Sequence, residues 1–108
     1  MMGYYTRFKL ETYTPEDYRI IAFALEKQSN YDSLFSDGEP YKWYEQDEDC
    51  KAVSAEYPTI LFAINGDGEE SGDKWQRVYH NGNLIDESRE PEWHYPQLPK
   101  KKEEAIND

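Results

Sequence analysis

Residues 60–85 decide the fold, and they read ILFAINGDGEESGDKWQRVYHNGNLI. The first five form a continuous apolar run of strand length, flanked by a proline and a glycine, which is typical of a central β-strand. Residues 65–73 are a glycine-rich acidic loop, and residues 74–80 read as a further strand. Asn81-Gly82 is the strongest short signal for a hairpin, after which an apolar pair continues the returning strand. The stretch therefore predicts two or three antiparallel strands.

The chain before this stretch predicts two strands, two helices and a loop. Residues 4–11 alternate apolar and polar side chains, as a half-buried strand does. A threonine, a proline and two acids then start a helix over residues 15–28, because they supply a cap, a fixed φ and favourable charge. Residues 29–40 are rich in turn formers and predict a loop, followed by a short strand at 41–44. A second helix is expected over residues 45–57.

Together these elements predict an α+β fold, a two-layer sandwich in which two helices pack on one face of an antiparallel or mixed sheet. The length of 108 residues is that of one domain, which we place at residues 1–88. Residues 89–108 contain three prolines and a run of three lysines, and we expect an extended or disordered tail. The expected core residues are Phe8, Leu10, Ile21, Leu25, Val53, Ile60, Phe62 and Ile64.

One combination of residues resembles a known family. Trp43 precedes an acidic helix, and then come Glu56-Tyr57-Pro58, an apolar strand, Gly68-Glu69-Glu70, and Trp75 before Asn81-Gly82. This order, over residues 41–87, resembles the YubB-type ferredoxin-like domain of small, mostly uncharacterised plasmid and phage proteins. The resemblance implies a ferredoxin-like sandwich and an origin in a mobile element, and it supplies no catalytic residue.

The clearest signal in the composition is charge. The formal net charge is −11, and residues 1–88 carry 18 of the 23 acids and 8 of the 12 bases. A field of this sign repels phosphate backbones and anionic membranes, which argues against direct binding to nucleic acid or to a membrane. It leaves a basic protein surface or a metal cation as partners, while solubility alone is the plainer reason for excess acid. With one cysteine, no secretory signal and no apolar run that could cross a bilayer, the chain is expected in the cytoplasm.

Catalytic and metal-binding patterns are weak. The loop of residues 65–73 starts like a calcium-binding EF-hand, but glutamate stands where the sixth position needs glycine and glutamine where the twelfth needs glutamate. Cys50 is expected on the inner face of the second helix among acids that suppress the thiolate, so an inert buried cysteine is the better interpretation. The many carboxylates form pairs by chance and leave a minor hydrolase as a third alternative. We expect no enzyme activity, no metal and no cofactor.

The remaining signal is two acidic groups close to aromatic residues. A helix face and a turn rich in carboxylates can imitate the phosphates of a duplex and occupy the basic groove of a nucleic-acid-binding protein. We therefore hypothesise a phage-type inhibitor of a host defence system, such as a CRISPR effector or a restriction enzyme. The alternatives are a scaffolding module of a mobile element, or solvated acids over core tryptophans. The expected partner-binding residues are Glu45, Asp47, Glu48 and Asp49, then Asp67, Glu69, Glu70 and Asp73, with Trp75 as an aromatic anchor.

Overall fold

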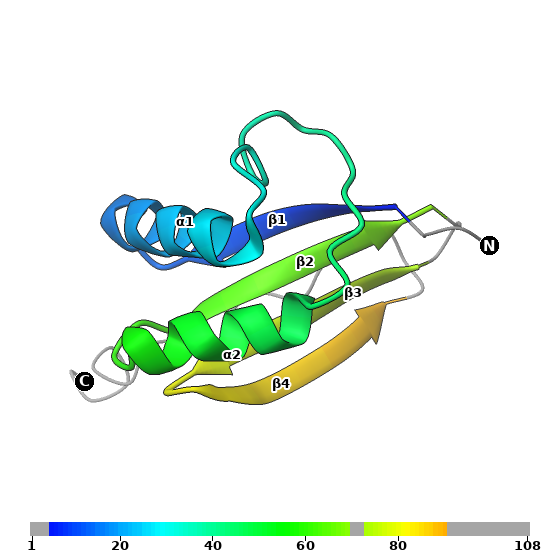
Figure 1. Cartoon of the computed structure of the whole chain (residues 1–108). Coiled ribbons are helices and arrows are strands. Elements are labelled where there is room, and N and C mark those ends of the chain that lie inside the picture. Colours follow the sequence, from blue (N-terminus) through cyan, green and yellow to red (C-terminus); the bar gives the residue numbers. More distant parts are fainter. Residues whose placement is uncertain (1–4, 70–72, 91–108) are drawn as a thin grey trace.

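The computed structural model describes residues 5–69 and 73–90, which form one sheet covered by two helices on one face (Figure 1). The elements in chain order are β1 Thr6–Thr12, α1 Pro15–Ser29, α2 Gln46–Glu56, β2 Phe62–Gly68, β3 Lys74–His80 and β4 Asn83–Glu90. All neighbouring strands are antiparallel and follow the order β1-β2-β3-β4, so the sheet is a meander. Among the described residues, no helix is long and apolar enough to cross a membrane.

The predicted α+β sandwich is confirmed, whereas its ferredoxin-like arrangement is wrong. A ferredoxin-like fold needs strands between its two helices, and here only a loop joins α1 to α2. The strand expected at 41–44 is reduced to one bridge, in which Tyr41 and Thr6 exchange backbone hydrogen bonds of 2.9 and 3.0 Å. The Tyr44 N–H then bonds to the Lys42 carbonyl, which turns the chain toward α2 and ends the pairing.

Helix α1 has the bounds that its sequence predicts, extended by one residue at its end. The Thr14 hydroxyl oxygen accepts a hydrogen bond of 3.0 Å from the Asp17 backbone N–H, and a proline occupies the first turn. Asn30 ends the helix in the left-handed conformation, with a φ of 67°. Ile21 and Leu25 lie one turn apart and are fully buried in the core, so local capping and the apolar spacing agree.

The core lies between the sheet and the two helices. Seven of the eight predicted core residues are buried, and Phe62 has no exposed surface, which confirms the register of the central strand. The exception is Ile60, which precedes β2 and is partly buried against the core. The core also includes residues outside the predicted set: Leu34, Trp43, Cys50, Trp75 and Tyr79.

Strand β2 differs from its prediction at both ends. It starts at Phe62 instead of position 60, and it continues to Gly68 through residues that the sequence predicts as a loop. Pairing on both sides explains the difference, because β1 and β3 take up the backbone hydrogen bonds of this segment. Gly66 is required here, since a Cβ at this position would overlap the indole ring of Trp75.

The hairpin between β3 and β4 forms where it is predicted. Asn81 and Gly82 both have positive φ, 55° and 80°, as a type I′ turn requires. Strand β4 continues to Glu90, two residues beyond the expected end of the domain. The rest of the expected tail, residues 91–108, lies outside the described residues.

Candidate partner-binding surface

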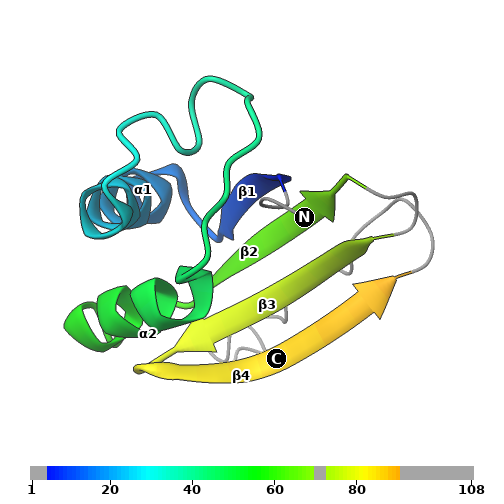
Figure 2. The ribbon, with the colours of Figure 1, turned by 45° about the vertical axis from the view of Figure 1, so that its right-hand side comes forward.

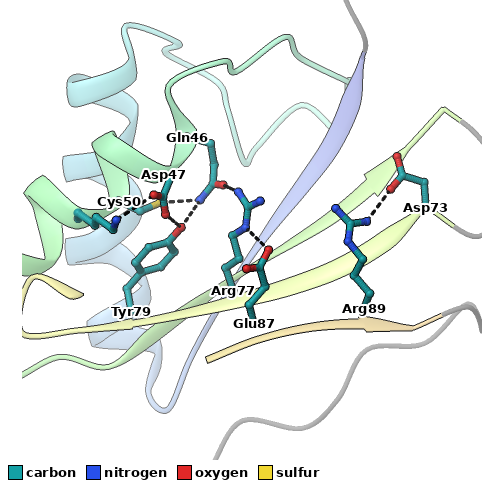
Figure 3. A network of polar contacts seen from close by, with 9 residues as sticks. Gln46, Asp47, Cys50, Asp73, Arg77, Tyr79, Glu87 and Arg89 are labelled. Carbon is teal, nitrogen blue, oxygen red and sulfur yellow. Dashed lines mark hydrogen bonds and ion pairs between the residues drawn. The ribbon is translucent and has the colours of Figure 1, made fainter. Parts of the chain in front are cut away.

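A network of polar side chains fixes the start of α2 to the sheet (Figure 3). The buried Gln46 side-chain NH₂ donates to the Tyr79 hydroxyl (2.9 Å) and to the Cys50 sulfur (3.2 Å). Its side-chain oxygen accepts a hydrogen bond from Arg77 Nη1 (2.5 Å). Arg77 in turn pairs with Glu87 on β4, with 3.0 Å between Nε and Oε2. Residues from α2, β3 and β4 thus meet, and the sheet sets the position of the first helical turn.

Asp47 belongs to this turn, and its carboxylate is held in the ionised form. The Tyr79 hydroxyl donates to one carboxylate oxygen (2.8 Å), and the Lys51 ammonium lies 3.0 Å from the other. Partial burial raises the pKa of the Asp47 carboxyl, but the hydrogen bond from Tyr79 and the positive charge of Lys51 outweigh it, so the pKa is lowered overall. The side chain is 38% exposed, which leaves this carboxylate accessible to a partner.

The other three acids of the first predicted group have different surroundings. Asp49 is 7% exposed and accepts a hydrogen bond of 2.8 Å from the Trp43 indole N–H, so its carboxylate serves the core. Glu45 and Glu48 are exposed, and within the described residues no basic side chain pairs with either. Glu48 lies in the first turn of α2 and Glu45 is the N-cap residue before it, and the positive end of the helix dipole stabilises negative charge at this place.

The loop before α2 carries further exposed acids that the sequence prediction did not single out, among them Asp37 and Glu39. Their segment is tied to the sheet, because Arg7 Nε on β1 donates to the Gly38 carbonyl (3.1 Å). The loop then descends past β1 to the start of α2 (Figure 2). The sequence does contain a signal for these acids, since residues 37–48 contain five acids and one base. We name these five accessible acids the acidic surface: Asp37, Glu39, Glu45, Asp47 and Glu48.

Asp37 is held ionised by its neighbours in the loop. The Tyr41 hydroxyl donates to one of its carboxylate oxygens (2.5 Å), and the Glu39 backbone N–H donates to the other (2.9 Å). The hydrogen bond from Tyr41 lowers the pKa of Asp37, and the same contact raises the pKa of Tyr41 to about 12. The loop therefore keeps this negative charge at neutral pH.

The second predicted acidic group lies at the other end of β3, and its two aspartates are paired. Asp67 lies 2.8 Å from the Lys74 ammonium, and Asp73 lies 3.2 Å from the Arg89 guanidinium. Asp73 precedes Arg77 by four residues, about 13 Å of extended strand, and Figure 3 shows it well apart from the network at the start of α2. The two predicted groups therefore do not form one surface.

The glutamates of this second group are placed differently from its aspartates. Glu69 is exposed, and its carboxylate accepts a hydrogen bond of 2.9 Å from the Tyr5 backbone N–H. Glu70 lies outside the described residues. Among the described acids of this group, Glu69 thus adds accessible negative charge without a basic side chain paired with it.

Trp75, the predicted aromatic anchor, is 9% exposed and lines a small pocket beside the acidic surface. Aromatic rings make up half of the lining: Phe8, Trp43, Tyr44 and Trp75. The polar part of the lining comes from Thr6, Gln46, Asp47 and Arg77. The Phe8 ring packs edge-on against both indoles, with centroids 5.1 and 6.1 Å away. We name this space, with a volume of about 260 Å³, the Trp pocket.

Cys50 is buried, as its sequence context predicts. It has no exposed surface, and burial raises the pKa of its thiol, with the nearby carboxylates of Asp49 and Asp47 adding to the rise. A protonated thiol inside the core is a poor nucleophile. In the part of the chain that the structure describes, no three side chains of His, Cys, Asp or Glu gather as a metal site.

The resemblance of residues 41–87 to the YubB-type domain implies a ferredoxin-like arrangement, and the meander order of the sheet departs from it. Three of the elements in the stretch that carries the resemblance are present: the acidic helix α2, the apolar strand β2 and the hairpin at Asn81-Gly82. Compared with protein-family models, with curated proteins and with solved structures, the chain matches none.

Proposed function

We propose that this chain is a small acidic binding protein of phage type that inhibits a host nucleic-acid-binding defence protein. CRISPR effectors and restriction enzymes are the target classes, and the chain would occupy their basic groove in place of nucleic acid. The acidic surface carries this proposal, because its five accessible carboxylates come from one loop and from the start of the helix that follows it. Such carboxylates offer a basic groove the same charge as the phosphates of a duplex.

The absence of internal partners supports this role for Glu45 and Glu48. No base of the described chain pairs with them, so a basic partner breaks no existing ion pair when it binds. Exposed charges of one sign also raise the rate of association with an oppositely charged surface. The net charge of −11 repels nucleic acid and anionic membranes, which favours a basic protein surface as the partner.

The proposed action is binding without catalysis, and it requires no metal or cofactor. The Asp49 carboxylate is engaged by the buried Trp43 indole N–H, which fits a structural use of this acid. The buried Cys50 thiol is likewise engaged by the Gln46 amide. Inhibition would follow from occupancy of the groove alone.

The test is capture from a nuclease-treated bacterial lysate on the immobilised full chain, followed by mass spectrometry. We expect the wild type to retain nucleic-acid-binding proteins, and added duplex DNA or RNA to release them by competing for the same groove. The Glu45→Lys/Glu48→Lys variant should retain much less. The matched control is Glu56→Lys/Asp86→Lys, which changes the net charge equally at exposed positions outside the acidic surface. Retention that neither added nucleic acid nor the first variant reduces would refute the proposal.

A second candidate is a structural or scaffolding module, and the open edge of the sheet favours it. Within the described sheet, β4 pairs only with β3, and Ile85 on β4 is 49% exposed. An added strand or an apolar contact at this edge would not depend on the acids. Salt separates the two candidates, since an electrostatic complex loses affinity between low and physiological ionic strength and an edge-strand complex changes little.

A further inference from the structure

We propose that the Trp pocket binds an arginine side chain of the partner protein, with the guanidinium against the aromatic rings and paired with Asp47. This inference rests on the proposed function and names the residue type that the partner inserts beside the acidic surface. Asp47 connects the two sites, because it belongs to the acidic surface and also lines the Trp pocket.

The size of the Trp pocket suits one side chain. Its volume of about 260 Å³ is below the ~300–1,000 Å³ usual for drug-sized ligands. Phe8, Trp43 and Trp75 are each less than a tenth exposed and pack in the core, while the Tyr44 ring is 73% exposed. The Trp pocket thus combines fixed aromatic walls with one aromatic ring that is open to solvent.

The charges in the lining of the Trp pocket favour a cation as the occupant. The positive charge of Arg77 in the lining is matched by Glu87, 3.0 Å away, and by the Gln46 side-chain oxygen. The Asp47 carboxylate is ionised and 38% exposed. A carboxylate has about four acceptor positions. Asp47 accepts one hydrogen bond from Tyr79 and pairs with Lys51, and the positive charge of Arg77 also acts on it.

Lys51 competes with an incoming cation for the Asp47 carboxylate, because its ammonium already pairs with it. Its side chain is 45% exposed, and exposed pairs of this kind are weak because water screens them. A partner's guanidinium can therefore replace the ammonium at Asp47. A variant without Lys51 should bind the guanidinium more tightly than the wild type does.

The shape of the lining favours arginine over lysine. The protein already contains the required contact, since the Arg77 guanidinium lies 4.6 Å from the ring centroid of Trp75. A planar guanidinium stacks on aromatic faces and presents paired donors to a carboxylate, whereas an ammonium is a compact and strongly hydrated charge. The acidic surface alone would attract both residue types, so a preference for arginine is the signature of the Trp pocket.

The test is titration of the ¹⁵N-labelled full chain with tetra-arginine and tetra-lysine peptides, followed by NMR of the Trp43 and Trp75 indole N–H resonances. We expect the arginine peptide to shift both resonances and to bind several-fold more tightly than the lysine peptide. Asp47→Asn should weaken its binding several-fold, and Lys51→Gln should strengthen it. The controls are Glu56→Gln and Lys27→Gln, which make the same charge changes at exposed positions away from the Trp pocket and should alter affinity little.

The outcomes separate this inference from the proposed function. Equal affinity for both peptides without indole shifts would overturn the arginine site while leaving the acidic surface intact. Equal effects of Asp47→Asn and Glu56→Gln, or of Lys51→Gln and Lys27→Gln, would overturn it as well. Failure of both peptides to bind would contradict both the arginine site and the proposed function.

Discussion

The two acidic groups of this protein look alike in sequence and differ in what surrounds them. Residues 45–49 read EQDED and residues 67–73 read DGEESGD. In the first group Glu45 and Glu48 meet solvent, and no described base pairs with them. In the second, Asp67 and Asp73 each contact a base. The number of acids in a stretch of sequence therefore does not measure the charge that the folded protein offers to a partner.

The difference follows from the elements that carry the two groups. Strand pairing places side chains from separate segments opposite one another, as it does for Asp67 and Lys74, so charges on a sheet meet counter-charges. The first turn of a helix carries a partial positive charge of its own, and acids there are stabilised without a base. Acids at the start of a helix can therefore stay unpaired and accessible, whereas acids on paired strands meet a base and are neutralised.

The largest expected effect concerns Asp49, an acid of the first group that lies in the core. Asp49→Ala leaves the Trp43 indole N–H buried without its acceptor, which should lower the free energy of unfolding by about 1–3 kcal/mol. Asp49→Asn is the control, because its amide oxygen can still accept the hydrogen bond. Urea denaturation measures both variants. If Asp49→Ala cost no more than Glu48→Ala, the distinction between core and surface acids in this turn would be wrong.

A smaller effect is expected from the hydrogen bond that holds Asp47. Tyr79→Phe removes the donor to Asp47 and also the hydroxyl that accepts from the Gln46 amide, and the loss of the bond to Asp47 should cost about 0.5–1.5 kcal/mol at neutral pH. Folding lowers the pKa of Asp47, so its contribution to stability is present above the unfolded pKa of about 3.9 and is lost as the pH falls through the folded value. The difference between wild type and variant should therefore shrink below about pH 4. Urea denaturation at neutral and acid pH checks this, and a difference independent of pH would speak against the Asp47 contact.

The smallest effects on stability are expected at the paired end of the sheet. Asp67→Asn and Asp73→Asn each break one ion pair with partly exposed members, and each should cost at most about 1 kcal/mol. Added salt should reduce the loss further, because it screens exposed pairs. Thermal unfolding at low and high salt measures this. Losses as large as that of Asp49→Ala would show that these pairs are structural, which would remove the contrast between the two groups.

Local signals predicted the elements well, and long-range contacts decided the rest of the fold. Helix α1 follows from its own caps at Thr14 and Asn30, and the hairpin from Asn81-Gly82. The strand expected at 41–44 fails because only Tyr41 reaches β1, and β2 extends because it has partners on both sides. Neither outcome can be predicted from a short stretch of sequence, because both depend on pairing between distant segments.

The same division applies to the candidate site. Acids at a helix start are visible in sequence, and Glu45 and Glu48 are exposed as a first helical turn allows. The burial of Asp49 depends on its hydrogen bond with Trp43, which lies outside the helix. The burial of Trp75 depends on Gly66 on the neighbouring strand, so no pattern within β3 reveals it.

The most direct test of the acidic surface compares two variants with the same change in net charge. Isothermal titration at physiological ionic strength measures the dissociation constant of the captured partner for wild type, Glu45→Gln/Glu48→Gln and Asp67→Asn/Asp73→Asn. At about 0.2–1 kcal/mol for each exposed charge, the first variant should bind roughly two- to thirtyfold more weakly, and the second should change by less than about twofold. Equal losses in both variants, or no loss in the first, would contradict the assignment of binding to the acidic surface.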